Sequence, residues 1–430
     1  MDKIKIKLYD MLLALSNAVD LVTPELFNHH QQVASLAFRL AEQIGLSKEE
    51  QRDILICGML HDIGALSVNE RLSLIENEPV TVNSHAFRGA KLLGEYRPFR
   101  PISEVIRCHH VPWGFGGGRQ LHGKDVPLLS RLLYIADRTC VLIDYKSDIL
   151  PQIPGILDKI RSQADERFMP QAVDALMELG GKEYVWLELA YKNPLQFMPD
   201  ISSFGTTYLD IDDVVCISRI FSRVIDFRSR FTATHSAGVA SVAEKLGEMA
   251  GFSQNECKML LIAGYLHDLG KLAIKESILE KPSKLSEREY SIIRSHTFYT
   301  YQLLNTIAGF ETINAWASYH HEKLDGTGYP FHLKGDSIPM GSRIMAVADV
   351  FTAVTEHRPY RKGMEKEQVI RVLGSMAKSG AICPEVVLML VNNFGLFTEL
   401  CNESQKQAFF DYEQFFRDSG PERNPLETCD

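Results

Sequence analysis

Apolar residues recur at three- and four-residue spacing in two distant segments of the chain, which is the period of an amphipathic helix. In the first segment they are Val33, Leu36, Ala37, Leu40, Ala41 and Ile44, and in the second Val239, Val242, Ala243, Leu246 and Ala250. Each segment is followed by a Ser-x-x-Glu pattern, at 47–50 and 253–256, that is typical of a helix N-terminal capping box. No stretch of convincing length alternates as a strand would. We therefore predict an all-α protein.

The helix after each capping box ends in His-Asp-(Ile/Leu)-Gly, and matching residues continue along the chain in the same order. In both copies the first two histidines are 32 residues apart, and a double histidine follows the third histidine by 24 residues. The matched residues are His29, His61, Asp62, His85, His109, His110 and Asp137 in the first copy, and His235, His267, Asp268, His296, His320, His321 and Asp349 in the second. Coincidence does not explain five matched histidines, so the pattern indicates an internal duplication. We expect Gly64 and Gly270, which close the His-Asp motifs, to be helix C-caps.

The duplication predicts two tandem domains. We place the first at residues 1–195 and the second at 205–400, with a linker between them that contains Pro, Ser and Gly. Residues 401–430 contain one amphipathic stretch and an acidic end, which predicts a C-terminal helix followed by a disordered tail. The histidines without a repeat partner, His30, His122, His332 and His357, are assigned to surface or packing roles.

Composition narrows the class of protein. The net charge of −9 argues against a protein that binds bulk nucleic acid, because such proteins usually carry a basic balance. The eight cysteines are widely spaced and form neither a CxxC metal site nor a disulfide framework. No run approaches the roughly 18 apolar residues that span a bilayer. We expect a soluble cytoplasmic protein with no membrane segment.

The matched histidines and aspartates predict a metal site in the second copy. A single His-Asp doublet is more often a hydrogen-bonded pair in a core, but seven such residues in order would each need a partner if no metal were bound. Mixed imidazole and carboxylate ligands suit Mn, Fe, Co or Zn, and a carboxylate can bridge two ions. Two close metals can activate a shared water and stabilise both the attacking and the leaving oxygen at phosphorus. Lys271, one turn beyond Asp268, is positioned to neutralise a phosphate oxygen. These residues indicate a phosphodiesterase or phosphohydrolase.

Three motifs of the second copy resemble the HD-GYP branch of the HD superfamily of metal-dependent phosphohydrolases. They are HDLGK at 267–271, HHEKLDGTGYP at 320–330 and ADVFTAVTEHRPYR at 348–361. The resemblance implies a bacterial cyclic-dinucleotide phosphodiesterase with an iron or manganese centre. It implies that all seven matched residues of the second copy are ligands, with Asp268 as the bridging carboxylate. It also implies that Lys271, Tyr329, Arg358 and Arg361 contact the substrate, mainly its phosphates.

The second copy departs from the family pattern at three positions. Phe231 stands where three-metal members carry a glutamate, so we expect two metals. Thr352 and Ser229 each replace an acidic residue near the substrate, so the usual cyclic di-GMP cannot be assumed. The tandem arrangement is similar to Vibrio-type phosphodiesterases specific for 3',3'-cGAMP. We therefore favour 3',3'-cGAMP, with cyclic di-GMP next, cleaved by a metal-bridging hydroxide to the linear 5'-phosphorylated dinucleotide.

The first copy resembles only the broader HD fold. It keeps all seven candidate ligands and has Glu25 where three-metal members place their glutamate. However, Ala65 replaces the lysine, and the glycine-rich segment 113–118 replaces the GYP loop. Such a loop can cradle phosphate, although no helix start clearly follows it. Three interpretations stay open: a degenerate structural partner, a second nucleotide-binding or regulatory site, and an accessory phosphatase that removes the terminal phosphate of the linear product.

Two other functions compete for the chain as a whole. One is an HD-type nucleotidase that acts on mono- or triphosphates, against which the GYP loop and the arginines of 358–361 argue. The other is a catalytically silent effector that binds a cyclic dinucleotide, against which Lys271 and the complete second ligand set argue.

Overall fold

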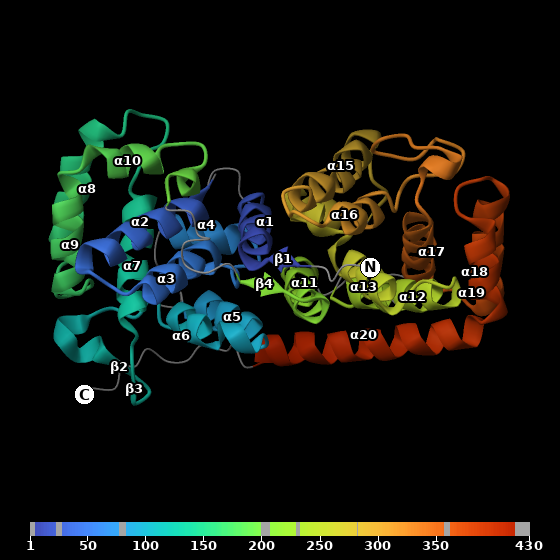
Figure 1. Ribbon diagram of the computed structural model, residues 1–430, viewed down its shortest axis with the longest axis horizontal. Coiled ribbons are helices and arrows are strands. Elements are labelled where there is room, and N and C mark those ends of the chain that lie inside the picture. Colours follow the sequence, from blue (N-terminus) through green and yellow to red (C-terminus); the bar gives the residue numbers. More distant parts are fainter. Residues whose placement is uncertain are drawn as a thin grey trace. The chain divides into compact units, whose positions relative to one another are not determined.

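The computed structural model describes residues 5–22, 28–76, 83–198, 207–228, 233–281, 283–356 and 362–417. Helices make up nearly all of its regular structure (Figure 1), so the predicted all-α class is confirmed. The described strands are two residues long and form two antiparallel pairs. β1 (Ile6–Lys7) pairs with β4 (Tyr208–Leu209), and β2 (Gln120–Leu121) pairs with β3 (Lys124–Asp125). None of the described helices is both long and apolar enough to cross a membrane.

The chain forms two compact units. The N-terminal unit is built from Val19–Thr207, and the C-terminal unit from Tyr208–Gln414 together with the described residues up to Ala18. The last described residues, from Phe415 on, group with the N-terminal unit. The predicted first domain, residues 1–195, includes residues 5–18. They pack with the second unit instead, because buried Ile6 pairs with Leu209. The helix that we expected to start near residue 401 begins at Phe394, and the tail beyond residue 417 lies outside the described residues.

The helices of both units have the following bounds. In the N-terminal unit they are α2 (His29–Ile44), α3 (Lys48–Leu60), α4 (Val68–Glu76), α5 (Asn83–Gly94), η2 (Arg97–Phe99), α6 (Arg100–Arg107), η3 (Gly114–Arg119), α7 (Leu128–Val141), η4 (Leu150–Gln152), α8 (Ile153–Arg161), α9 (Pro170–Gly180), α10 (Glu183–Leu189) and η5 (Pro194–Phe197). In the C-terminal unit they are α1 (Leu8–Asp20, whose last two residues group with the other unit), α11 (Ile211–Asp226), α12 (His235–Met249), α13 (Gln254–Leu266), η7 (Leu269–Ala273), α14 (Glu276–Leu279), α15 (Glu287–Leu304), α16 (Glu311–Ser318), η8 (Gly335–Ser337), α17 (Met340–Thr355), α18 (Lys366–Lys378), α19 (Pro384–Asn392) and α20 (Phe394–Arg417).

The central helix of each unit is the amphipathic helix predicted from the apolar spacing, α2 in the N-terminal unit and α12 in the C-terminal unit. α2 packs on α3 and α7, and α12 packs on α13 and α17 in the same way. A glycine lets α2 pack closely on α3, and another lets α12 pack closely on α13. A Cβ on Gly58 would lie 2.3 Å from Ala34 Cα, and a Cβ on Gly264 would lie 2.4 Å from Ala240 Cα. The predicted capping boxes, Ser47 with Glu50 and Ser253 with Glu256, are both formed. They begin α3 and α13 and so set where the His-Asp motifs fall.

The glycines of the His-Asp motifs are not the C-caps that we predicted. α3 and α13 end three residues earlier, with His61 and His267 as right-handed cap residues. Gly64 and Gly270 are needed for another reason: a Cβ would lie 2.1 Å from His85 O in one unit and 1.9 Å from His296 O in the other. Because any side chain would clash there, these glycines let the helix of the third histidine lie directly against the His-Asp motif.

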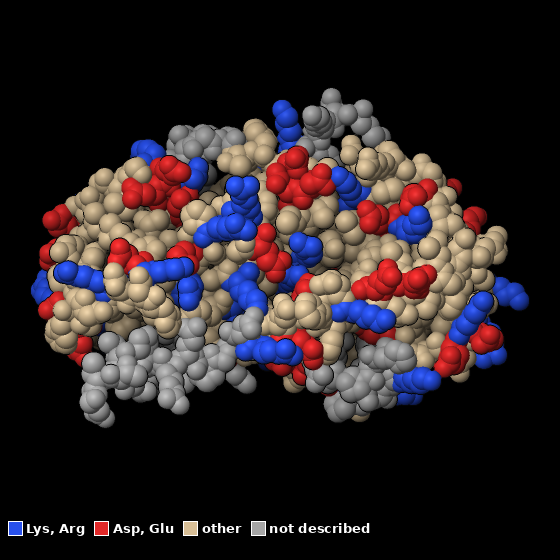
Figure 2. Space-filling model, turned by 90° about the horizontal axis from the view of Figure 1, so that it is seen from below, with Lys and Arg blue, Asp and Glu red and all other residues tan. Residues whose placement is uncertain are grey.

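Charged side chains of both signs are interspersed on the face drawn in Figure 2, and they do not gather there into one basic band. This face therefore lacks the electrostatic footprint of a protein that binds bulk nucleic acid.

Candidate metal centres

The C-terminal unit brings all seven predicted ligands of the second copy into one cluster. They come from the start of α12, the end of α13, the middle of α15, the turn after α16 and the middle of α17. They lie close in two groups: His235, His267 and Asp268, and His296, His320 and His321. The seventh residue, Asp349, contacts both groups, because its Oδ1 lies 3.2 Å from His235 Nε2 and its Oδ2 lies 4.0 Å from His321 Nδ1.

Asp268 occupies the position expected of a bridging carboxylate. Its Oδ2 lies 3.3 Å from His267 Nε2, and its Oδ1 lies 3.5 Å from His296 Nε2, so its two oxygens face the two groups. Asp268 is buried, but nearby His267 and the Lys271 ammonium outweigh the cost of burial and hold the pKa of its carboxyl well below the usual range. The carboxylate is therefore ionised, as a metal ligand must be.

Backbone carbonyls orient three of the imidazoles. Nδ1 of His267 donates to Gly264 O at 2.8 Å, and Nδ1 of His296 and His320 donates to Ile293 O and Ala317 O, each at 2.6 Å. A neutral imidazole that donates from Nδ1 has only a lone pair on Nε2. These Nε2 atoms all turn toward the centre, and those of His296 and His320 lie 3.4 Å apart. Burial lowers the pKa of His296 to about 3, so its ring is neutral near pH 7.

These contacts test whether the residues suit a metal. The Nε2 lone pairs of His296 and His320, which face each other, repel unless a cation lies between them. His267 Nε2 is buried and has no hydrogen-bond partner among the described residues. Imidazole nitrogens fixed by a backbone acceptor on the opposite nitrogen are typical of metal ligands. The donor set therefore fits divalent cations.

His235 has a carboxylate beside its Nδ1 instead of a backbone carbonyl. Glu356, the residue after α17, accepts a hydrogen bond from Thr234 Oγ1 at 2.8 Å, and its Oε2 lies 3.7 Å from His235 Nδ1. Burial opposes protonation of His235 in the metal-free protein, but Asp349 and Glu356 outweigh it and raise its pKa to about 10. Glu356 follows Thr352 by one helical turn, and Thr352 is fully buried. The sequence pattern indicates the missing acid at position 352 but gives no signal for Glu356.

Backbone N–H groups that follow the GYP motif donate to a buried glutamate and hold the GYP loop next to the centre. Buried Glu322 accepts the amide N–H of Phe331 at 2.6 Å and that of Leu333 at 3.0 Å. A Cβ on Gly328 would lie 2.3 Å from Lys323 N, so only glycine fits there. This brings the Tyr329 ring to 5.0 Å from that of His321. Burial raises the pKa of the Tyr329 phenol above its usual range, so the phenol keeps its proton near neutral pH.

Lys271 lies at the more open edge of the cluster. Its ammonium pairs with Asp268 Oδ2, and 25% of its side chain is exposed. Of the ligands, His321 is also partly exposed, at 31% of its side chain. Lys271 and His321 are therefore the residues of the cluster that solvent reaches most. Arg358 and Arg361, which we expected to contact the substrate, lie outside the described residues, as do Phe231 and Ser229.

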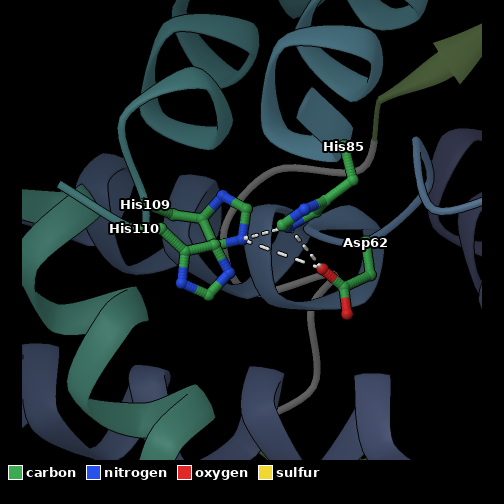
Figure 3. Close-up of side chains that lie close together, drawn as sticks. All are labelled: Asp62, His85, His109 and His110. Atoms are coloured by element: carbon green, nitrogen blue, oxygen red, sulfur yellow. Dashed lines mark hydrogen bonds and ion pairs between the residues drawn. The ribbon is translucent and has the colours of Figure 1, made fainter. Parts of the chain in front are cut away.

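The N-terminal unit assembles the equivalent seven residues. His29, His61 and Asp137 form one group, and Asp62, His85, His109 and His110 form the other. Figure 3 shows the second group, in which His85 and His109 point toward Asp62. Asp62 Oδ1 lies 3.2 Å from His85 Nε2, and His29 Nε2 lies 3.2 Å from Asp137 Oδ1. His61 and His109 donate from Nδ1 to Gly58 O and Ile106 O, which is the same orienting contact as in the other unit. Glu25 lies outside the described residues.

Three differences distinguish the N-terminal centre from the other one. All seven side chains are buried there, whereas His321 and Asp349 of the other unit are partly exposed. The Arg138 guanidinium donates to Asp137 Oδ2 from Nε at 3.0 Å and from Nη2 at 2.8 Å, whereas Val350 follows Asp349 in the second copy. Ala65, in place of Lys271, is fully buried, and its carbonyl accepts a hydrogen bond from Arg71 Nε at 2.8 Å.

The glycine-rich segment of the first copy does not form a phosphate cradle. The amides of Trp113, Gly114 and Phe115 donate to the carbonyls of residues 165–167, at 3.0, 2.7 and 2.8 Å. Those of Gly116 and Gly118 donate to Trp113 O. Because these N–H groups are already used, they are not available to a phosphate.

A buried carboxylate behind each centre was missed in the sequence. Asp20 pairs with His30 Nδ1, and Asp226 accepts hydrogen bonds from Ser236 Oγ at 3.0 Å and Ser222 Oγ at 3.2 Å. Each aspartate precedes the first histidine of its copy by nine residues, so the repeat itself contained the signal. His30, for which we expected a surface or packing role, is buried.

Known proteins match this chain over nearly its whole length. The HD domain family matches residues 14–144 and 219–386. A curated relative from Vibrio cholerae serotype O1, 3'3'-cGAMP-specific phosphodiesterase 1, is 29% identical over 408 residues, which cover 92% of this chain and 94% of the relative. The cyclic di-GMP phosphodiesterase response regulator RpfG of Xanthomonas campestris pv. campestris is 35% identical over 190 residues, which cover 44% of this chain and 50% of the relative.

A solved structure shares the fold. The crystal structure of V-cGAP3, described as a cyclic GMP-AMP specific phosphodiesterase of V. cholerae, matches with a TM-score of 0.65 at 23% identity. The match covers 91% of this chain and 98% of that one. The duplicated His-Asp pattern, the two ligand clusters and the two matched regions lead to the same conclusion. The chain belongs to the HD domain family.

Proposed function

We propose that the C-terminal unit is the catalytic part of a metal-dependent phosphodiesterase that hydrolyses a cyclic dinucleotide to the linear 5'-phosphorylated dinucleotide. The observation that carries the proposal is the convergence of seven His and Asp side chains, with lone pairs turned inward, beside the Lys271 ammonium. The names of relatives that match this unit support the same chemistry.

Two divalent cations, iron or manganese, fit the two groups of ligands. His235, His267 and Asp349 would hold one, His296, His320 and His321 the other, and Asp268 would serve both. When bound, such a pair supplies Lewis acid catalysis and an activated water for hydrolysis at phosphorus.

The chain's own side chains bind and orient the substrate. The Lys271 ammonium lies on the exposed side of Asp268 and can donate to a phosphate oxygen, whose charge increases in the transition state. The Tyr329 phenol, which stays protonated, can donate a second hydrogen bond from the GYP loop. Asp268 holds Lys271 in place through the ion pair between them.

The preferred substrate is 3',3'-cGAMP, with cyclic di-GMP next. The full-length relative named for 3'3'-cGAMP supports the first, and RpfG, which covers less than half of the chain, supports the second. Thr352, in place of the usual acid, also favours a departure from cyclic di-GMP.

Product analysis tests the proposal. Anaerobically purified, Fe- or Mn-loaded protein is incubated with each dinucleotide separately, beside a His267→Ala/Asp268→Ala variant. Cleavage that is lost in the variant supports the proposal, and the ratio of rates identifies the preferred substrate. Cleavage of nucleoside mono- or triphosphates alone would favour a nucleotidase. Binding of both dinucleotides without cleavage, in protein with full metal content, would favour an effector.

We propose a structural metal centre for the N-terminal unit. Its candidate ligands are gathered as in the other unit but are buried, and the lysine is absent. In the glycine-rich segment, the amides of residues 113–116 and of Gly118 already donate to backbone carbonyls. A His61→Ala/Asp62→Ala variant should lose bound metal and thermal stability but still cleave the cyclic substrate. If release of the terminal phosphate from the linear product also stopped, the accessory phosphatase would be the better interpretation.

A further inference from the structure

Arg294 lies on α15, two residues before the ligand His296, and stacks on the GYP loop. Its Cζ is 4.7 Å from the centre of the Tyr329 ring. The same ring lies beside the candidate ligand His321, at 5.0 Å between ring centres. The Tyr329 ring therefore lies between Arg294 and the candidate metal ligand His321. A nucleotide whose phosphate lies at the metals extends its sugar and base over a similar range.

The Arg294 side chain has capacity left for a ligand. Among the described residues its guanidinium makes the contact with Tyr329 and no hydrogen bond or ion pair. It is only partly buried, and Tyr290, one turn earlier on α15, is 51% exposed. A guanidinium that contacts an aromatic ring with one face has a second planar face on which another ring can stack. Nucleobases stack on such guanidinium and aromatic surfaces in proteins that bind single-stranded nucleotides.

We propose that Arg294, supported by Tyr329, is a nucleobase-binding platform on which a purine of the cyclic dinucleotide stacks. The proposal rests on the proposed function of the C-terminal unit and adds to it the subsite for a base. Stacking tolerates different purines, so the platform serves guanine and adenine alike. The first copy has Asn83 at the position of Arg294 and no GYP tyrosine, so it lacks the platform.

Binding experiments with Mn-loaded protein test the proposal independently of turnover. The probe is the phosphorothioate analogue of 3',3'-cGAMP, titrated by calorimetry, and a second analogue carries 2-aminopurine, whose fluorescence falls when the base stacks. We expect Arg294→Ala to weaken binding roughly 5- to 100-fold and to abolish the quenching. Arg294→Lys, which keeps the charge and loses the planar face, should bind as weakly as Arg294→Ala. The matched control Arg288→Ala, an exposed arginine of the same helix, should bind as the wild type does.

Titration of inorganic phosphate separates a base contact from a phosphate contact. The platform predicts an unchanged phosphate affinity in Arg294→Ala. Equal weakening for phosphate, or rescue by Arg294→Lys, would overturn the proposal, as would wild-type binding and quenching in Arg294→Ala. Wild-type protein that binds the analogue with quenching but cleaves no cyclic dinucleotide would overturn the proposed function and leave the platform standing. Wild-type protein that binds no cyclic dinucleotide would overturn both.

Discussion

Glu356 Oε2 lies 3.7 Å from His235 Nδ1, while His235 Nε2 lies 3.2 Å from Asp349 Oδ1. Glu356 thus places a carboxylate beside the Nδ1 side of the imidazole, while Nε2 faces Asp349. The corresponding Nδ1 atoms of His267, His296 and His320 donate to backbone carbonyls instead. Glu356 also lies at the point where α17 leads into the segment with Arg358 and Arg361.

Removing this carboxylate should weaken metal binding. We expect Glu356→Ala to lower the affinity for Mn²⁺ about 10- to 100-fold, because the imidazole loses the group that fixes its orientation. Calorimetric titration of metal-free protein with MnCl₂ measures the effect. Glu367→Ala, an exposed glutamate of α18, is the control. Equal Mn²⁺ affinities of Glu356→Ala and wild type would contradict the assignment.

Lys271 should act on turnover rather than on metal content. Lys271→Ala removes a charged donor next to Asp268, and we expect kcat on the cyclic dinucleotide to fall about 100-fold. Metal content, measured by mass spectrometry, should stay at the wild-type level. Lys275→Ala, an exposed lysine one turn later, should leave kcat unchanged. A variant that loses its metals with its activity would show that Lys271 maintains the centre instead.

Arg138 should compensate the charge of Asp137 when no metal is bound. Arg138→Met leaves a buried carboxylate without its guanidinium, which should lower the free energy of unfolding by about 3–5 kcal/mol in metal-free protein. Added Mn²⁺ should reduce the loss, because a cation replaces the missing charge. Urea unfolding measures both quantities. Arg161→Met, which breaks an exposed pair with Asp158, should cost less than about 1 kcal/mol, and a similar cost for both variants would refute the prediction.

Asp226 should make stability depend on pH. Burial raises its pKa to about 7 in metal-free protein, although His235 and Ser236 oppose the shift. Between about pH 4 and 7 the folded chain therefore holds a proton that the unfolded chain has lost, so stability falls as pH rises through this window. Asp226→Asn cannot ionise, so it should not lose stability in this way and should be more stable than wild type at pH 8. The difference in free energy of unfolding between variant and wild type should increase by at most about 4 kcal/mol from pH 4 to pH 8. The measurement is urea unfolding at both pH values, with Asp212→Asn of the same helix as control. A constant difference between variant and wild type would contradict it.

Much of this protein was predictable from local sequence. Helix periodicity and the Ser-x-x-Glu boxes predicted α2, α3, α12 and α13, because both signals arise within one or two helical turns. The repeated spacing of His and Asp predicted both ligand clusters, since two copies of one pattern must place equivalent residues at equivalent points of one fold.

Tertiary structure decided what those residues do once they meet. Glycine is required at positions 64 and 270 because a side chain would clash with a backbone carbonyl of a helix that comes more than twenty residues later. The ends of the preceding helices do not require it. The amides of Trp113, Gly114 and Phe115 donate to carbonyls some fifty positions away. Glu356 lies beside a histidine more than one hundred positions earlier. Arg138 and Val350 occupy equivalent positions in the two copies. The Arg138 guanidinium donates to Asp137 in the buried N-terminal centre, whereas the C-terminal centre is partly exposed at His321. Spacing along the chain determines which face of its own helix a residue occupies. The contact partner on another helix depends on how the helices pack, and that depends on every apolar side chain between them.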